Sequence, residues 1–181
     1  MRVIAGSARG TRLGPVPVGT RPLSDRAREG LFSSLGHRVV GAKVLDLFAG
    51  TGAVGIEALS RGALHATFVD NSRRAVATIE ANLKRTKLVE LATPVRADWN
   101  VFFAHQEPKR YDLVFLDPPY RIPGEEVDAA LFFLDEGWLS PGWTVVLTRP
   151  RRSYTDVVPV NWQVTRRLEY GDTLVVVYRE V

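Results

Sequence analysis

A glycine-rich turn between an apolar run and a helical pattern constrains the fold of this chain more than any other feature. Residues 44–48 are apolar except for Asp46, which predicts a buried parallel strand. Three glycines spaced Gly-x-Gly-x-x-Gly follow at positions 50–55, and a helical pattern continues over residues 56–63. Glycines permit a sharp turn and a close approach of ligand, and a helix N-terminus offers unpaired N–H groups. The stretch therefore predicts a site for a nucleotide-like cofactor, and the same spacing also fits a dinucleotide.

From residue 43 onward the predicted strands and helices alternate, which is typical of a doubly wound α/β sheet. Two further apolar runs near the C-terminus are joined by Tyr170-Gly171-Asp172, which predicts an antiparallel hairpin and makes the sheet mixed. The predicted strands cover residues 44–48, 65–69, 91–97, 111–116, 143–148, 162–168 and 173–178.

Positive charge is concentrated near the N-terminus. The first 43 residues carry eight Lys and Arg against two acidic residues, whereas the rest carry sixteen basic and eighteen acidic side chains. Residues 24–35 predict a helix, and the short β-capable runs before it predict a hairpin or two extended segments. We expect an RNA-gripping appendage over residues 1–40 and a cofactor-binding catalytic domain over residues 41–181. A basic arm of this kind suits a polyanion, and the arginines expected to contact it are Arg2, Arg9, Arg12, Arg21, Arg26 and Arg28.

Missing residue types exclude several classes of function. The chain has no cysteine, which excludes disulfides, iron–sulfur clusters and cysteine nucleophiles. Its three histidines are scattered, so we predict no metal site. No run approaches the roughly 20 apolar residues of a membrane span, and the N-terminal run is too short for a signal peptide. We therefore expect a cytoplasmic protein without a membrane partner.

Acidic residues follow several predicted strands, where open α/β sheets bind ligands. Asp70 lies twenty residues after Gly50, where an acid accepts hydrogen bonds from ribose hydroxyls; capping the next helix is the alternative. Asp98 suits an adenine amino group, with Trp99 packing on the ring, and a solvated loop acid is the alternative. Asp46 lies in a buried strand and needs donors, either N–H groups of the glycine loop or a ligand ammonium.

The motif Asp117-Pro118-Pro119-Tyr120 follows the predicted strand over residues 111–116. Two prolines fix the backbone, so a carboxylate and a carbonyl are held in place. These two acceptors suit the two hydrogens of an exocyclic amine on a planar base, and the aromatic ring suits stacking on an extruded base. A rigid turn with an apolar anchor is the structural alternative.

Taken together, these stretches resemble a class I S-adenosylmethionine-dependent methyltransferase of the amino-group type. Residues 44–55 and 113–120 carry that resemblance. Residues 2–12 and 21–32 are similar to the N-terminal segments of the RsmD family, bacterial 16S ribosomal RNA guanine-N2 methyltransferases. The resemblance implies a seven-stranded sheet, an N-terminal hairpin and helix that grip RNA, and methylation of one guanine in an assembled or late-assembling small subunit. We expect a monomer.

The resemblance also implies a role for each motif residue. S-adenosylmethionine would be held at its methionine end by Asp46 and the loop, at its ribose by Asp70, and at its adenine by Asp98 and Trp99. Asn71 is also expected to bind the cofactor. The loop residues are Phe48, Ala49, Gly50, Thr51 and Gly52, and the catalytic residues are Asp117, Pro118, Pro119 and Tyr120. The sequence Thr148-Arg149-Pro150 departs from the family pattern, and Arg149, Arg151 and Arg152 are expected to extend the basic surface.

Three alternatives stay open on sequence grounds. An adenine-N6 methyltransferase uses the same four-residue motif. A nicotinamide dehydrogenase would use the glycine turn but leaves Asp117 to Tyr120 and the basic arm without a role. A non-catalytic RNA-binding assembly factor would keep the arm and bind no S-adenosylmethionine.

Overall fold

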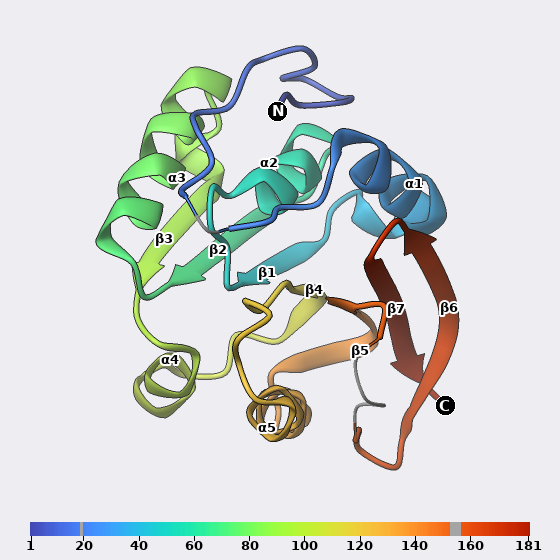
Figure 1. Ribbon diagram of the computed structural model, residues 1–181. Coiled ribbons are helices and arrows are strands. Elements are labelled where there is room, and N and C mark those ends of the chain that lie inside the picture. Colours follow the sequence, from blue (N-terminus) through green and yellow to red (C-terminus); the bar gives the residue numbers. More distant parts are fainter. Residues whose placement is uncertain (19, 153–156) are drawn as a thin grey trace.

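A seven-stranded sheet forms the centre of the computed structural model, which describes residues 1–18, 20–152 and 157–181 (Figure 1). The strand order is β3-β2-β1-β4-β5-β7-β6; the first five strands along the chain are parallel, and β7 is antiparallel to both β5 and β6. The predicted mixed sheet is confirmed. The strands are β1 (Lys43–Leu47), β2 (His65–Asp70), β3 (Ala92–Arg96), β4 (Tyr111–Leu116), β5 (Leu139–Pro150), β6 (Trp162–Tyr170) and β7 (Thr173–Glu180).

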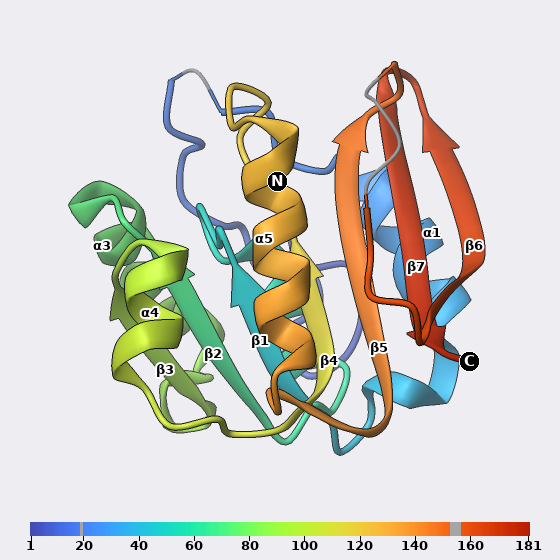
Figure 2. The same ribbon diagram turned by 90° about the horizontal axis from the view of Figure 1, so that it is seen from below.

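Helices cover both faces of the sheet (Figures 1 and 2). Helices α1, α2 and α3 pack into a hydrophobic cluster on one face, and α4 and α5 pack into a second cluster on the other. None of the helices in the described ranges is long and apolar enough to cross a membrane. The helices are α1 (Asp25–Leu35), α2 (Ala53–Ser60), α3 (Arg73–Thr86), α4 (Trp99–His105) and α5 (Gly124–Asp135), with short 3-10 turns η1 (Gly36–Val39) and η2 (Val89–Leu91).

Close packing of α2 on the sheet requires glycine at position 55. A Cβ atom at Gly55 would lie 2.4 Å from the ring of Phe68, a fully buried residue of β2. The backbone N–H of Gly55 also donates to Asp46 Oδ2 on β1, at 3.0 Å. The third glycine of the turn therefore sets the distance between helix and strand, as its place in the sequence pattern suggests.

The N-terminal segment forms less regular structure than predicted. Instead of a hairpin with two strands, one antiparallel bridge joins Arg2 to Arg12. The N–H of Val3 donates to the carbonyl of Thr11 at 3.0 Å, and the N–H of Gly10 donates to the carbonyl of Val3 at 2.8 Å. Of the two arrangements expected, the structure therefore has extended segments joined by one bridge and not a regular hairpin, because side chains of α2 take the next backbone donors.

Two buried polar side chains of α2 hold this segment. Glu57 is fully buried and accepts the N–H groups of Ile4 and Ala5 at 2.9 and 3.1 Å. The hydroxyl of Ser60 accepts the N–H of Ala8 at 2.9 Å and donates to the carbonyl of Ala5 at 2.6 Å. We call residues 1–14 the N-terminal arm. It is fixed to α2 by hydrogen bonds that join residues more than 50 positions apart.

The prediction that Arg28 contacts RNA is wrong, because its side chain is fully buried. Its guanidinium donates to the carbonyl of Arg2 at 2.9 Å and to Asp25, and it lies 3.6 Å from the carboxylate of Glu57. A buried cation is tolerated only when it is paired and hydrogen-bonded. Arg28 therefore belongs to the clamp that joins α1, α2 and the N-terminal arm.

Arg149 is likewise wrongly placed on the basic surface. It lies within β5, which extends to Pro150, and it is 4% exposed. Arg151 and Arg152 are exposed as expected, and Arg151 forms an ion pair with Glu169 at 2.9 Å. The predicted fifth strand ended too early because an arginine and a proline rarely mark the interior of a strand.

The first 40 residues share a hydrophobic cluster with the sheet. Val3, Leu13 and Phe32 are buried in the same cluster as Val44 of β1 and Ile56 of α2. This shared cluster shows how the N-terminal residues are supported, whereas their separation as an appendage over residues 1–40 stays a prediction.

Replacing Glu57 with alanine tests the clamp. Glu57→Ala leaves two backbone donors without their acceptor and removes a buried carboxylate that pairs with Arg28, so we expect the free energy of unfolding to fall by about 3–5 kcal/mol. Urea unfolding measures this change. Glu80→Ala on the exposed side of α3 is the matched control, and an equal loss in both variants would contradict a special role for Glu57.

Candidate active site

The carboxyl ends of β1, β2, β3 and β4 lie at one edge of the sheet because these strands are adjacent and parallel. The residues predicted to bind the cofactor follow three of these ends, and the motif that begins at Asp117 follows the fourth. One contact joins two of the predicted groups directly, since the N–H of Gly50 donates to Asp70 Oδ2 at 2.9 Å. The sheet topology therefore brings together residues from four separate parts of the sequence.

The glycine loop is sharply turned. Phe48, Gly50 and Gly52 have φ values of 66°, 58° and 77°. A positive φ is uncommon for a bulky residue such as Phe48, and such strain is frequent at ligand sites. The N–H of Ala49 donates to the carbonyl of Val69 at 2.9 Å, which ties the loop to β2. No described atom lies within 4 Å of the position that a Cβ would take on Gly50, so this side of the loop is open to a ligand.

Asp70 is held by two backbone donors. Its Oδ2 accepts from Gly50 and its Oδ1 accepts from the N–H of Ser72 at 2.9 Å. The cap of α3 is Ser72 itself, whose hydroxyl accepts the N–H of Ala75. Each oxygen of a carboxylate accepts more than one hydrogen bond, so Asp70 is oriented by the protein and retains acceptor capacity for ribose hydroxyls.

Asp46 is buried in β1 with the N–H of Gly55 as its donor, which confirms that the glycine-loop region supplies a partner. Burial raises the pKa of Asp46 well above its ordinary value, and the nearby carboxylates of Asp117 and Asp70 raise it further. Asp46 therefore lies buried near two other acids, beside an open loop. A positively charged ligand bound here would favour the ionised form of Asp46.

Asp117 is half-buried at the end of β4, and burial raises its pKa to about 7. Pro118 is buried, and Pro119 is exposed and accepts the N–H of Ile122 through its carbonyl at 3.0 Å. The motif is therefore a rigid turn with its acid at the inner end. A carboxyl group with a pKa near 7 both accepts and releases a proton at physiological pH.

The ring of Tyr120 is on the surface, 42% exposed, as expected for a stacking side chain. Its hydroxyl lies 3.2 Å from the hydroxyl of Thr173, the first residue of β7. This contact between the motif and the C-terminal hairpin has no signal in the sequence, because the two residues are 53 positions apart.

Asp98 and Asn71 form one unit at the ends of β3 and β2. The amide of Asn71 donates to Asp98 Oδ1 at 2.7 Å, and Asp98 is exposed. Trp99 is directed elsewhere: its indole N–H donates to Glu126 of α5 at 2.9 Å, and its ring packs against Phe133 of α5. Asp98 is thus available to an adenine amino group, while Trp99 is engaged between α4 and α5.

Thr51 supports the loop instead of facing its open side. Its side chain is buried and its hydroxyl lies 3.9 Å from the sulfur of Met1. The amide of Asn82, buried on α3, donates to the carbonyl of Thr51 at 2.9 Å and accepts the N–H of Gly14 at 2.7 Å. Asn82 therefore joins the glycine loop to the N-terminal arm. The sequence shows it only as a polar residue on the inward face of a predicted helix.

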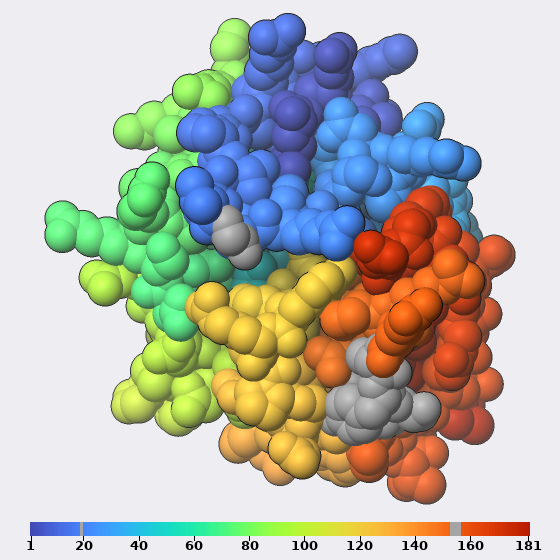
Figure 3. All heavy atoms as spheres, in the orientation of Figure 1, coloured from blue at the N-terminus to red at the C-terminus, as the bar shows by residue number. Residues whose placement is uncertain are grey.

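Five of the six predicted RNA-contacting arginines are exposed, namely Arg2, Arg9, Arg12, Arg21 and Arg26. In Figure 3 the N-terminal residues (blue) lie beside the segment that follows β4 (yellow). Part of the N-terminal segment and the segment that follows β4 therefore adjoin on one face of the molecule.

Comparisons with known proteins agree with this arrangement. A family model described as "Conserved hypothetical protein 95" matches residues 1–179. The chain is 37% identical over 185 residues to "Putative rRNA methyltransferase YlbH" of Bacillus subtilis, covering 99% of both chains. It is 35% identical over 181 residues to "Ribosomal RNA small subunit methyltransferase D" of Escherichia coli strain K12, covering 99% of this chain and 89% of that protein.

A solved structure is also similar to this chain over nearly its whole length. The structure titled "Putative methyltransferase yhhF from Escherichia coli" superposes with a TM-score of 0.88 at 32% identity, covering 99% of this chain and 97% of that one. The chain belongs to the RsmD family of methyltransferases. The predicted class I methyltransferase fold is confirmed by this match.

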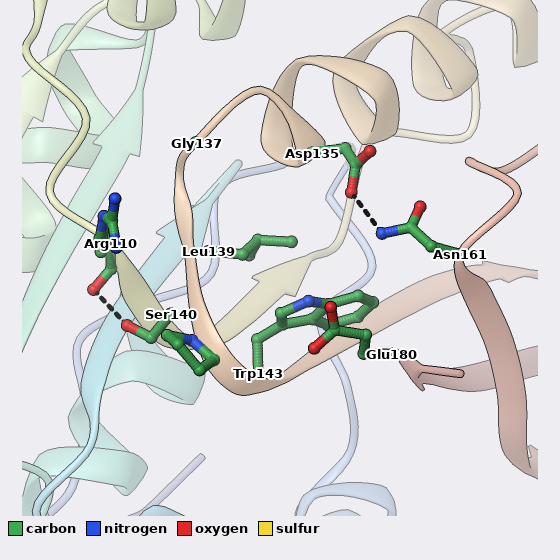
Figure 4. A pocket seen from close by; sticks show the side chains of 9 residues that line it. Arg110, Asp135, Gly137, Leu139, Ser140, Trp143, Asn161 and Glu180 are labelled. Atoms are coloured by element: carbon green, nitrogen blue, oxygen red, sulfur yellow. Dashed lines mark hydrogen bonds between the residues drawn. The ribbon is translucent and has the colours of Figure 1, made fainter.

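A cavity of about 280 Å³ lies away from the residues discussed so far in this RsmD-family chain (Figure 4). It is lined by Leu139, the first residue of β5, and by Trp143 and Asp135. Because β5 runs parallel to β4, this cavity is at the opposite edge of the sheet from Asp117. This cavity is therefore not the site of the predicted chemistry.

The raised pKa of Asp117 predicts a pH-dependent stability. A carboxyl group with a pKa of about 3.9 in the unfolded chain and about 7 in the folded protein destabilises the fold as pH rises. The stabilisation of the fold by the protonated carboxyl group is fully present below the pKa of the unfolded chain. It is lost progressively as the pH rises to about 7. Asp117→Asn removes this loss, so its free energy of unfolding relative to the unmodified protein should rise between pH 4 and 7 and level off above.

Urea unfolding at a series of pH values measures that difference. Glu125→Gln on the exposed first turn of α5 removes one negative charge elsewhere and is the matched control. A difference between Asp117→Asn and the unmodified protein that stays constant from pH 4 to 8 would contradict the raised pKa.

Proposed function

We propose that this chain transfers a methyl group from S-adenosylmethionine to the exocyclic N2 of a guanine in 16S ribosomal RNA. The observation that carries the proposal is the position of Asp117, at the end of β4 and within electrostatic reach of Asp46 beside the open glycine loop. The names of the relatives support methylation of ribosomal RNA. The choice of guanine N2 follows the family resemblance of the Asp117–Tyr120 motif and the N-terminal segments.

The residues around the loop fit S-adenosylmethionine, which supplies a methyl group carried on a positively charged sulfonium. Asp70 would bind the ribose hydroxyls and Asp98 the adenine amino group. Asp46 and the backbone of residues 48–52 would hold the methionine end. Asp46 is buried near Asp70 and Asp117, and a cation bound there would favour its ionised form, so the electrostatics favour this cofactor over an uncharged one.

Asp117 and the carbonyl of Pro118 would act on the amine of the base. The lone pair of an exocyclic amine is delocalised into the ring, and two acceptors that bind both of its hydrogens favour the pyramidal, nucleophilic form. Positive charge that develops on the nitrogen is stabilised by the carboxylate. Asp117 then takes up the surplus proton, which a group with a pKa near 7 releases readily to water. Tyr120 would stack on the extruded guanine.

The natural substrate in this proposal is an assembled or late-assembling small ribosomal subunit, and the protein acts on it as a monomer in the cytoplasm. Exposed arginines of the arm and of the start of α1 support a polyanionic partner. The subunit context, the monomeric state and the location rest on the resemblance of the sequence.

Removing the carboxylate of Asp117 tests the catalytic assignment. Asp117→Ala should reduce methyl transfer to under-methylated small subunits by at least about 10²-fold, since it deletes a charge-stabilising acceptor. The dissociation constant for S-adenosylmethionine should stay within a few-fold, because Asp70, Asp98 and the loop remain. Labelled cofactor followed by nucleoside mass analysis measures the product, and N6-methyladenine as the product would overturn the guanine assignment.

Charge removal on the N-terminal arm and at the start of α1 tests the RNA assignment. In the triple variant Arg9→Gln/Arg12→Gln/Arg26→Gln, the slope of log affinity against log salt should flatten by about 2 to 3, because each phosphate contact contributes about 0.7–0.9. Filter binding to 16S ribosomal RNA measures the slope. The matched control removes three charges far from the arm, in Lys109→Gln/Arg166→Gln/Arg167→Gln, and an equal flattening there would contradict a localised arm.

A further inference from the structure

A second cavity lies on the same side of the sheet as Asp117 and has no part in the proposed function so far. It has a volume of about 150 Å³ and lies between the segment that leads into α1 and the turn that joins β6 to β7. Its lining residues are Arg21, Pro22, Leu23, Ser24, Ala27, Tyr170, Gly171, Asp172 and Thr173.

This cavity adjoins the catalytic motif. Thr173 is a wall residue, and its hydroxyl lies 3.2 Å from the hydroxyl of Tyr120. Thr173 also pairs with Pro150, the last residue of β5, and β5 runs parallel to β4, which ends beside Asp117. In Figure 3 the N-terminal segment (blue), the segment after β4 (yellow) and the β6–β7 turn (red) meet on one face.

One wall of the cavity is fixed. Tyr170 is half-buried against α1, since a Cβ on Gly30 would lie 1.9 Å from its hydroxyl oxygen. The carbonyl of Asp172 accepts the N–H of Arg151 at 2.7 Å, which ties the turn to the end of β5. An aromatic ring and a fixed backbone turn therefore form a preorganised wall of the kind that binds nucleotides.

The mouth of the cavity carries a weak, exposed ion pair. Arg21 Nη2 lies 3.5 Å from Asp172 Oδ2, and the two side chains are 68% and 79% exposed. Ion pairs this exposed contribute little to stability and exchange partners easily. A phosphate group offers Arg21 a stronger, bidentate partner than this single long contact.

We propose that this cavity holds the nucleotide adjacent to the target guanine, with its phosphate replacing Asp172 as the partner of Arg21. A guanine that is lifted out of its stack and placed at Tyr120 remains covalently joined to its neighbours. The strand must therefore pass the surface beside Tyr120, where Thr173 and the cavity begin. Asp172 competes with the RNA for Arg21 and thus weakens the contact between Arg21 and the phosphate. The inference rests on the proposed function and adds a recognition site to it.

If the inference is correct, substitutions of Arg21 and of Asp172 have opposite effects on the KM for the RNA substrate. Arg21→Gln removes the phosphate contact, so the KM for under-methylated small ribosomal subunits should rise about threefold or more and the salt slope should flatten by about 1. Asp172→Asn removes the competitor and leaves Arg21 free for RNA, so the KM should fall about two- to fivefold. The dissociation constant for S-adenosylmethionine should not change in either variant.

A matched control lies on the same hairpin. Glu169→Gln removes one negative charge from an exposed ion pair with Arg151, three residues from Asp172, and should change the KM less than Asp172→Asn does. A rise in KM in both Arg21→Gln and Asp172→Asn would show that the pair only braces the hairpin, and would overturn the inference. No change in either variant, or an equal fall in KM with Glu169→Gln, would overturn it as well.

The unmodified protein separates this inference from the proposed function. If it methylates no guanine N2 in the subunits, the proposed function fails, and the variants are then compared by their affinity for subunits in sedimentation binding. If it methylates the guanine and the variants show no opposite effects, only the adjacent-nucleotide site fails.

Discussion

Burial of the acidic side chain of Asp46 next to two other acids is the constraint on which the site depends. Asp46, Asp70 and Asp117 come from the ends or interior of three adjacent parallel strands, so the sheet itself forces them together. Burial of Asp46 costs free energy that one hydrogen bond from Gly55 only partly offsets. A fold selected for stability alone would place an apolar residue at position 46. The strain is consistent with a site arranged for a cation.

The N-terminal arm and the glycine loop are parts of one hydrogen-bonded assembly. Glu57 and Arg28 fix the arm to α1 and α2, and Asn82 links Gly14 of the arm to Thr51 of the loop. The surface that carries the exposed arginines therefore cannot move independently of the loop beside Asp70. A rigid connection of this kind keeps a bound polyanion and a bound cofactor in fixed relative positions, which is what group transfer between them requires.

Local sequence patterns predicted most elements, but not the contacts between distant ones. Helix α1 follows from Ser24 as its N-cap and Gly36 at its end, since caps act within a few residues. The burial of Arg28 did not follow, because its acceptor Glu57 is 29 positions away and an arginine on a predicted basic helix suggests a surface charge. The structural role of Asn82 was missed for the same reason, as its partners lie 31 and 68 residues away.

The sequence predicts which residues form the site, but not the pKa values of their side chains. Strand topology alone places acids at one sheet edge, whereas the pKa of Asp117 depends on how deeply the turn is buried. That pKa links cofactor and catalysis in the proposed reaction. A positively charged methyl donor bound near Asp117 would favour the ionised form of this carboxyl group. Asp117 would then be able to accept a proton from the amine. Its raised pKa thus makes the protonation of this residue sensitive to a bound cation.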